Sequence, residues 1–233
     1  RPVSTLPRRK RLLTNAAQAV MMDRGVLDPA ADALLPPLHV VTDDGLSLRT
    51  AAVPEAAQQA LRDYMAATGQ GKAAERIRYV TSQISTQDTW SQTYGYFEIE
   101  ARIPRGKGRW PAFWMTFAGI GWPPEIDVFE AYGAGLSQRT PKDNTFNVAG
   151  FFDDEDADGR RGQRVDYENP FATTPEERQP RMRERGKRDV YDFHHTVDTT
   201  ALDADIYSDF HVYSALWGPE EIVFYFGPTR DSL

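Results

Sequence analysis

Regular alternation of apolar and polar side chains marks the second half of this chain. Residues 94–103 place Phe97 and Ile99 on one side and Glu98 and Glu100 on the other, and strand side chains alternate between faces with a period of two. The pattern therefore predicts a long strand with one buried face. Shorter β-like runs follow at residues 145–152, 210–216 and 222–226.

The first half combines a hairpin with a helix. An Asp-Gly pair at residues 44–45 separates two β-prone runs, residues 39–41 and 46–48, which is a strong signal for a two-stranded hairpin. Apolar residues recur at helical spacing across residues 54–69, which predicts one inserted helix. Many short strands and a single helix favour an all-β sandwich of antiparallel sheets.

Composition narrows the class of protein. Of the 233 residues, 40% are hydrophobic, which is enough for one substantial core, so we expect residues 1–233 to form a single domain. The net charge of −7 and a pI near 5.2 argue against a nucleic-acid partner, because such proteins present a basic face. The chain has no apolar run long enough to span a membrane, so we expect no membrane association.

Three carboxylates lie close together in residues 125–130, which read EIDVFE. Glu125 and Asp127 share one face of a strand, whereas regular alternation turns Glu130 into the core, where an ionised carboxylate is costly to bury. One extra residue at positions 128–129, a β-bulge, restores the register, and bulges are frequent beside active sites. The spacing thus predicts a bulged strand with all three acids on one face.

Two glutamates beside an aspartate match the needs of glycosidic bond cleavage. One carboxyl protonates the leaving oxygen, and a second attacks the anomeric carbon or activates water. Asp127 can hydrogen-bond Glu125 and, as a neighbouring negative charge, help to keep Glu130 protonated. The alternative is an exposed acidic face on an ordinary amphipathic strand.

Tryptophans flank the acidic strand at Trp110, Trp114 and Trp122. Indoles stack on the C–H faces of sugars, so their presence favours a sugar-binding surface. The alternative for each indole is packing in the core.

Three stretches together resemble glycoside hydrolase family 16: residues 94–102 (YGYFEIEAR), 108–114 (GRWPAFW) and 125–130 (EIDVFE), in this order and spacing. Weaker likenesses extend from about residue 40 to residue 227. The resemblance implies a β-jelly-roll of two curved antiparallel sheets and a retaining, endo-acting enzyme that cuts a β-linked polysaccharide without a cofactor. The six-residue acidic motif resembles the bulged branch, which includes laminarinases, agarases and carrageenases. The resemblance also implies that terminal strands are missing at both ends.

The same resemblance gives the acids their roles. Glu125 is the expected nucleophile, Glu130 the acid/base, and Asp127 the residue that assists Glu125. The indoles expected to line the sugar subsites are Trp110, Trp114 and Trp217.

Histidines form a second set of candidates. His211 can hydrogen-bond a sugar or the acids, and the alternative is a purely structural histidine. His194 and His195 are adjacent and so face opposite ways on a strand, which argues against a shared metal site.

Two charged segments add further hypotheses. Asp154, Asp156 and Asp158 begin a calcium-loop pattern, but the twelfth position is Val165 where a bidentate Glu is required, so a structural calcium stands beside a plain solvated loop. Residues 178–188 are rich in arginine. Guanidinium groups pair bidentately with carboxylates, which favours an anionic exopolysaccharide substrate, with a solvated loop as the alternative.

Two rival functions stay open. One is a non-catalytic carbohydrate-binding jelly roll, because a fold alone does not imply cleavage; intact acids argue against it. The other is a transglycosylase, in which a sugar hydroxyl replaces water. The expected partner is a polysaccharide, bound by a monomer that is secreted or periplasmic. The first residue is Arg1 rather than methionine, so we expect a fragment or a processed form.

Overall fold

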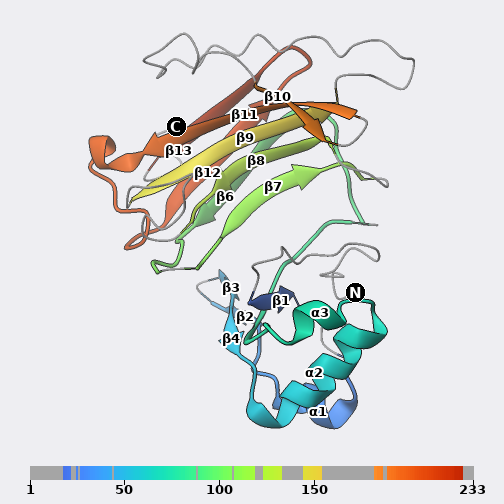
Figure 1. The fold of residues 1–233 in the computed structure, drawn as a ribbon. Coiled ribbons are helices and arrows are strands. Elements are labelled where there is room, and N and C mark those ends of the chain that lie inside the picture. The colour runs from blue at the N-terminus through green and yellow to red at the C-terminus, as the bar shows by residue number, and fades with distance from the viewer. Residues whose placement is uncertain are drawn as a thin grey trace. The chain divides into compact units, whose positions relative to one another are not determined.

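The described part of the chain forms two compact units. The computed structural model describes residues 18–21, 25, 27–43, 45–87, 89–106, 108–118, 123–132, 144–153, 181–185 and 188–227. The first unit spans Arg1–Ser91 and the second spans Gln92–Leu233 (Figure 1). The expectation of a single domain stays a prediction.

The first unit combines helices with short strands. The helices are α1 (Pro29–Leu34), α2 (Glu55–Ala67) and α3 (Gly71–Ala74). The strands are β1 (Ala19–Met21), β2 (His39–Thr42), β3 (Gly45–Leu48), β4 (Ala51–Ala52) and β5 (Tyr79–Thr81). β2 and β3 pair antiparallel as the predicted hairpin, although Asp44 lies outside the described residues. β5 lies between β1 and β4 in a three-stranded sheet.

The predicted inserted helix is α2. Ala57, Leu61 and Met65 lie four residues apart on one face of it, and their exposed fractions are 0%, 3% and 0%. α2 ends before Gly69, whose φ of 79° lies in the left-handed region that glycine adopts at helix ends. The spacing does not predict α1 or α3. Among the described residues, no helix is long and apolar enough to cross a membrane.

The second unit is a sandwich of two antiparallel sheets. The strands of the larger sheet, in hydrogen-bonding order, are β10 (Arg181–Arg185), β11 (Arg188–Asp198), β9 (Thr145–Asp153), β8 (Glu125–Glu130) and β7 (Ala112–Thr116). The strands of the smaller sheet are β13 (Ile222–Gly227), β12 (His211–Trp217) and β6 (Gly95–Ala101). Figure 1 shows the five strands of the larger sheet side by side. This architecture confirms the predicted all-β jelly-roll sandwich.

Aromatic side chains fill the space between the two sheets. The ring of Phe129 on β8 lies 4.5 Å from that of Tyr213 on β12, and Phe146 on β9 lies 5.2 Å from Tyr213. All three belong to one buried cluster. Because this core occupies one face of the larger sheet, residues at the alternate positions of β8 lie on the other face.

Candidate active site

A β-bulge in β8 brings the three acids into line. On β9, Ala149 lies opposite Asp127, and Asn147 lies opposite Glu130. β9 therefore advances two residues while β8 advances three, so one residue of β8 is extra. The register predicted from the spacing of the acids is confirmed.

The other neighbour of β8 shows the same shift. Trp114 of β7 pairs with Asp127, and its neighbour Phe113 pairs with Phe129, so Val128 has no paired residue on β7. Val128 and Phe129 are 1% and 3% exposed and pack in the core. Glu125, Asp127 and Glu130 thus share the opposite face of the sheet, called the acid face below.

The acids differ in burial. Asp127 is 2% exposed and Glu130 is 7% exposed, whereas Glu125 at the start of β8 is half-buried. Glu125 is thus partly open to solvent, whereas Glu130 is shielded from it. Such a difference in surroundings gives two carboxyls different chemical roles.

Two aromatic side chains hold Glu130. The indole Nε1–H of Trp110 donates to Oε1 at 2.8 Å, and the hydroxyl of Tyr132 donates to Oε2 at 3.2 Å. The two rings lie 5.0 Å apart. The backbone N–H of Ala131 also donates to the carbonyl of Pro111 at 3.0 Å, which joins the chain after β8 to the chain before β7. Glu130 therefore sits in a position built from two segments.

The strand neighbours extend the acid face. Asn147, opposite Glu130, is 2% exposed, and its Oδ1 accepts a hydrogen bond from the hydroxyl of Thr196 on β11 at 2.8 Å. Trp114, opposite Asp127, is half-buried. The structure thus brings Trp110 and Trp114, both sequence candidates, to the strand of acids.

Sequence reasoning did not find Tyr132 or Asn147. Tyr132 follows Glu130 by two residues, so the period of two that identified the acids also points to it. Asn147 carries no such signal, because its place opposite Glu130 follows from the pairing of β8 with β9.

The two adjacent histidines of β11 separate as expected. His194 pairs with Ala149, and His195 pairs with Val148; successive strand residues point to opposite faces. His194 therefore lies in the row of Asp127, two strands away, and its ring meets Phe151 edge-on at 5.1 Å.

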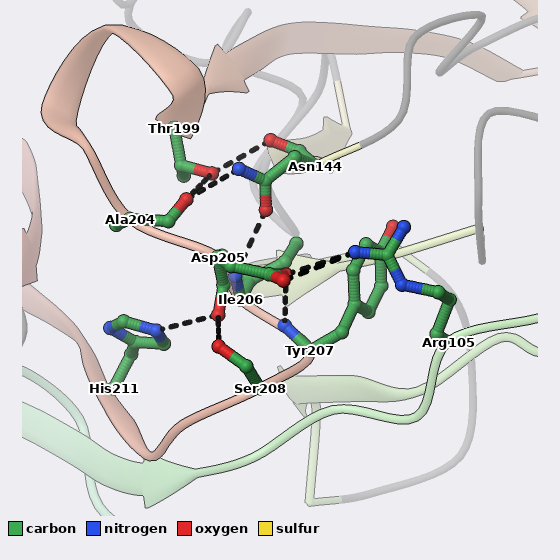
Figure 2. Close-up of polar contacts among 9 residues, drawn as sticks. All are labelled: Arg105, Asn144, Thr199, Ala204, Asp205, Ile206, Tyr207, Ser208 and His211. Carbon is green, nitrogen blue, oxygen red and sulfur yellow. Dashed lines mark hydrogen bonds and ion pairs between the residues drawn. The ribbon is translucent and has the colours of Figure 1, made fainter.

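His211 and Trp217 belong to the smaller sheet. His211 is 4% exposed, and Figure 2 shows its ring directed at the carbonyl of Asp205, with Nε2 at 3.1 Å from that oxygen. Trp217 packs against Tyr94, with ring centroids 5.1 Å apart. The structure does not bring either residue to the acid face.

The loop around Asp205 is tightly bonded (Figure 2). Asp205 forms an ion pair with Arg105 at 3.2 Å, and Asn144 accepts from the N–H of Ile206 at 2.9 Å. These contacts hold the segment that precedes β12 and give His211 a structural environment.

Several candidates lie outside the described residues. These are Trp122 and the acidic residues Asp154, Asp156 and Asp158. No cluster of metal-binding side chains occurs among the residues that the structure does describe.

An antiparallel sandwich with two glutamates and an aspartate on one sheet face has the chemistry of glycoside hydrolases. The profile of glycosyl hydrolases family 16 matches residues 43–169, more than half of the 233 residues. The chain belongs to this family. The recognition made from the three sequence stretches is confirmed.

Relatives in the family are named for the cleavage of β-glycans. The chain is 32% identical over 148 residues to endo-1,3-1,4-beta-glycanase ExsH of Rhizobium meliloti, a match that covers 64% of this chain and 22% of that protein. It is 46% identical over 55 residues to endo-1,3-1,4-beta-glycanase EglC of the same organism, covering 24% and 12%. The chain thus spans less than a quarter of the length of these relatives.

A solved structure with a similar arrangement is the laminarinase catalytic domain from Thermotoga maritima. Its TM-score is 0.43 at 18% sequence identity, over 81% of this chain and 49% of that chain.

Proposed function

We propose that this protein is a retaining, endo-acting glycoside hydrolase that cleaves a β-linked polysaccharide by double displacement. Glu125 is the nucleophile, Glu130 the acid/base, and Asp127 assists Glu125. The observation that carries this proposal is the bulge of β8, which aligns the three carboxyls on one face while Val128 and Phe129 enter the core.

The spacing of the acids suits this chemistry. Glu125 and Glu130 lie opposite Thr116 and Ala112 of β7, so they are four strand steps apart and their Cα atoms are separated by roughly 13 Å. Side chains that lean toward a sugar between them bring the carboxyls near the ~5.5 Å of a retaining mechanism.

The reaction proceeds in two steps. Glu125 attacks the anomeric carbon while Glu130 gives its proton to the glycosidic oxygen, which leaves with the electron pair of the broken bond. Glu130 then takes a proton from water as that water attacks the anomeric carbon and frees Glu125. Neither step requires a cofactor. A sugar hydroxyl in place of water would give transglycosylation on the same intermediate.

A β-1,3- or β-1,4-linked glycan is the proposed polymer, because ExsH and EglC are named as endo-1,3-1,4-beta-glycanases. An anionic glycan has additional support from β10, the edge strand of the sheet that carries the acids. Its sequence contains Arg181, Arg183 and Arg185, and guanidinium groups pair bidentately with carboxylates. Such a polymer lies outside the cytoplasm, which supports a secreted or periplasmic enzyme.

The deciding experiment is a panel of neutral and anionic β-glycans incubated with the wild type and with Glu125→Gln. We expect the wild type to produce new reducing ends and medium-sized oligosaccharides from one class, and Glu125→Gln to bind the same glycan without shortening it. If neither protein cuts any glycan while both bind one, the protein is a carbohydrate-binding module and the enzymatic proposal fails.

The anionic preference has its own test. Replacement of Arg181, Arg183 and Arg185 by glutamine should lower kcat/KM on anionic glycans relative to neutral ones, because guanidinium groups pair with carboxylates. An unchanged ratio between the two substrate classes would refute the anionic substrate and leave the hydrolase intact.

A further inference from the structure

The two partners of Glu130 differ in what they can do with a proton. An indole N–H is only a donor, whereas a phenolic hydroxyl both donates and accepts. Trp110 faces Oε1 and Tyr132 faces Oε2. Among the described residues, these two side chains are the hydrogen-bond partners of Glu130.

This difference determines which oxygen of Glu130 carries the transferable proton. Oε1 accepts from the indole N–H, and the carbonyl oxygen of a neutral carboxyl is a better acceptor than its hydroxyl oxygen, so the protonated form favours Oε1 as the carbonyl and Oε2 as the hydroxyl. Oε2 can carry the proton, because the hydroxyl of Tyr132 can turn from donor to acceptor or release the proton to a substrate. A buried carboxyl, 7% exposed, has little water to replace these partners.

The geometry around Trp110 is held by the backbone. The hydrogen bond from Ala131 to the Pro111 carbonyl fixes the residues that follow Trp110 against those that follow Glu130. The ring contact of 5.0 Å between Trp110 and Tyr132 limits the rotation of both side chains. Ala112 is the residue of β7 that lies opposite Glu130.

We propose that Trp110 is a positioning residue that confines the transferable proton of Glu130 to Oε2, with Tyr132 as its reversible partner. This inference rests on the proposed function and adds the atom that performs the acid/base step. In the first half of the reaction the Oε2–H bond breaks and the glycosidic oxygen gains the proton. In the second half Oε2 regains a proton from the attacking water.

Other titratable groups lie near Glu130, and both test variants keep them unchanged. Glu125 and Asp127 lie on the same strand, and His194 lies across β9 in the row of Asp127. β7 contributes no titratable residue opposite the acids, only Ala112, Trp114 and Thr116.

The test compares Trp110→Phe with Tyr132→Phe on the full chain, using the glycan cut by the wild type. Phenylalanine keeps an aromatic ring for sugar stacking at both positions. It removes only the hydroxyl at Tyr132, whereas at Trp110 it removes the N–H together with the second ring of the indole. Loss of the indole donor removes a hydrogen bond that is stronger to the carboxylate than to the acid. We expect kcat to fall about 10- to 100-fold.

The pH–rate profile separates positioning from structure. In Trp110→Phe the basic limb of the profile should move to higher pH, because the lost hydrogen bond favours the carboxylate. Tyr132→Phe removes a partner that serves both the acid and the carboxylate form of Glu130, so the basic limb should move clearly less than in Trp110→Phe. Equal shifts in the two variants, or no shift in Trp110→Phe, would overturn the proposal. Tyr225→Phe and Trp90→Phe, at exposed positions, are the matched controls and should keep the wild-type profile.

A second readout does not depend on turnover. The indole N–H signal of Trp110 in a proton–nitrogen NMR spectrum, identified by its loss in Trp110→Phe, should stay downfield of a free indole at neutral and at acidic pH, because Oε1 accepts in both protonation states. A signal that reaches the position of a free indole when the carboxyl protonates would refute the confined proton. An inactive wild type with a downfield signal at both pH values would refute hydrolysis while supporting the confined proton.

Discussion

Two buried polar side chains, one on each side of β8, differ in their hydrogen bonding. Glu130 on the acid face accepts hydrogen bonds from Trp110 and Tyr132. Tyr213, whose ring lies 4.5 Å from Phe129 on the core side, is 0% exposed, and its hydroxyl has no hydrogen-bond partner among the described residues. Burial, with a smaller contribution from Tyr207, raises the pKa of Tyr213.

The difference separates function from stability. A buried group with donors in place is held in one orientation, which acid/base chemistry needs. A buried hydroxyl without a partner destabilises the native state by about 1–3 kcal/mol, and the sandwich retains it because the phenol ring fills the core. Changes on the acid face should therefore alter activity, and changes at Tyr213 should alter stability.

The largest expected effect is on activity. Glu130→Gln should lower kcat roughly 10²- to 10⁴-fold, the contribution of general acid–base catalysis, because the amide cannot donate the proton. The amide has nearly the shape of the carboxyl and can still accept from Trp110, so the melting temperature should change little. Steady-state kinetics and thermal unfolding check both; a variant that stays fully active would contradict the role of Glu130.

Placement of a charge on the core side of the bulge gives the next largest effect. Val128→Asp buries an unpaired carboxylate in the core, so the free energy of unfolding should fall by more than about 3 kcal/mol. Val128→Ala only removes buried apolar volume and should lose about 2 kcal/mol. Urea unfolding measures both, and equal losses would mean that Val128 does not face the core.

A smaller effect is expected at the Asn147 support. Thr196→Val removes the hydroxyl that donates to the buried Oδ1 of Asn147, which should lower the free energy of unfolding by about 1–2 kcal/mol. Thr196→Ser keeps the donor and serves as the control in the same urea titration. If both variants unfold alike, the hydrogen bond does not stabilise the sheet.

The smallest effect has the opposite sign. Tyr213→Phe removes the unpartnered hydroxyl and should raise the free energy of unfolding by about 1 kcal/mol at neutral pH. The raised pKa of Tyr213 means that the unfolded chain releases its proton first, above pH about 10. The wild type should thus lose stability as pH rises past that value.

Alkaline unfolding measures this difference. The loss of stability above pH about 10 should be smaller in Tyr213→Phe than in the wild type, while Tyr225→Phe, at an exposed position, should follow the wild type. A variant less stable than the wild type at neutral pH would show that the hydroxyl has a partner.

The spacing of acids in residues 125–130 predicted the bulge because burial of a carboxylate is so unfavourable that one register alone is acceptable. The hairpin and α2 were predictable for similar local reasons. α1 carries a local signal too, since Asp28 caps it through hydrogen bonds to Ala30 and Ala31 at 3.1 Å, but its six residues are too few for a periodic pattern.

The rest of the site depends on contacts between distant segments. Trp110 is twenty residues from Glu130 in sequence. A tryptophan in a sequence predicts a large apolar side chain, but it does not predict where the indole N–H points. Thr196 reaches Asn147 across forty-nine residues. β11 was not predicted, because its polar start at residues 188–192 hides the alternation that follows.

The measurement that tests the central claim most directly is trapping of the covalent intermediate. A 2-fluoro glycoside with a good leaving group, built on the sugar that the enzyme cuts, slows the second step so that the glycosyl-enzyme accumulates. Peptide mass spectrometry should then find the label on Glu125, and no label on Glu125→Gln. A label on Glu130, or turnover of natural glycan by Glu125→Gln at the wild-type rate, would contradict the account.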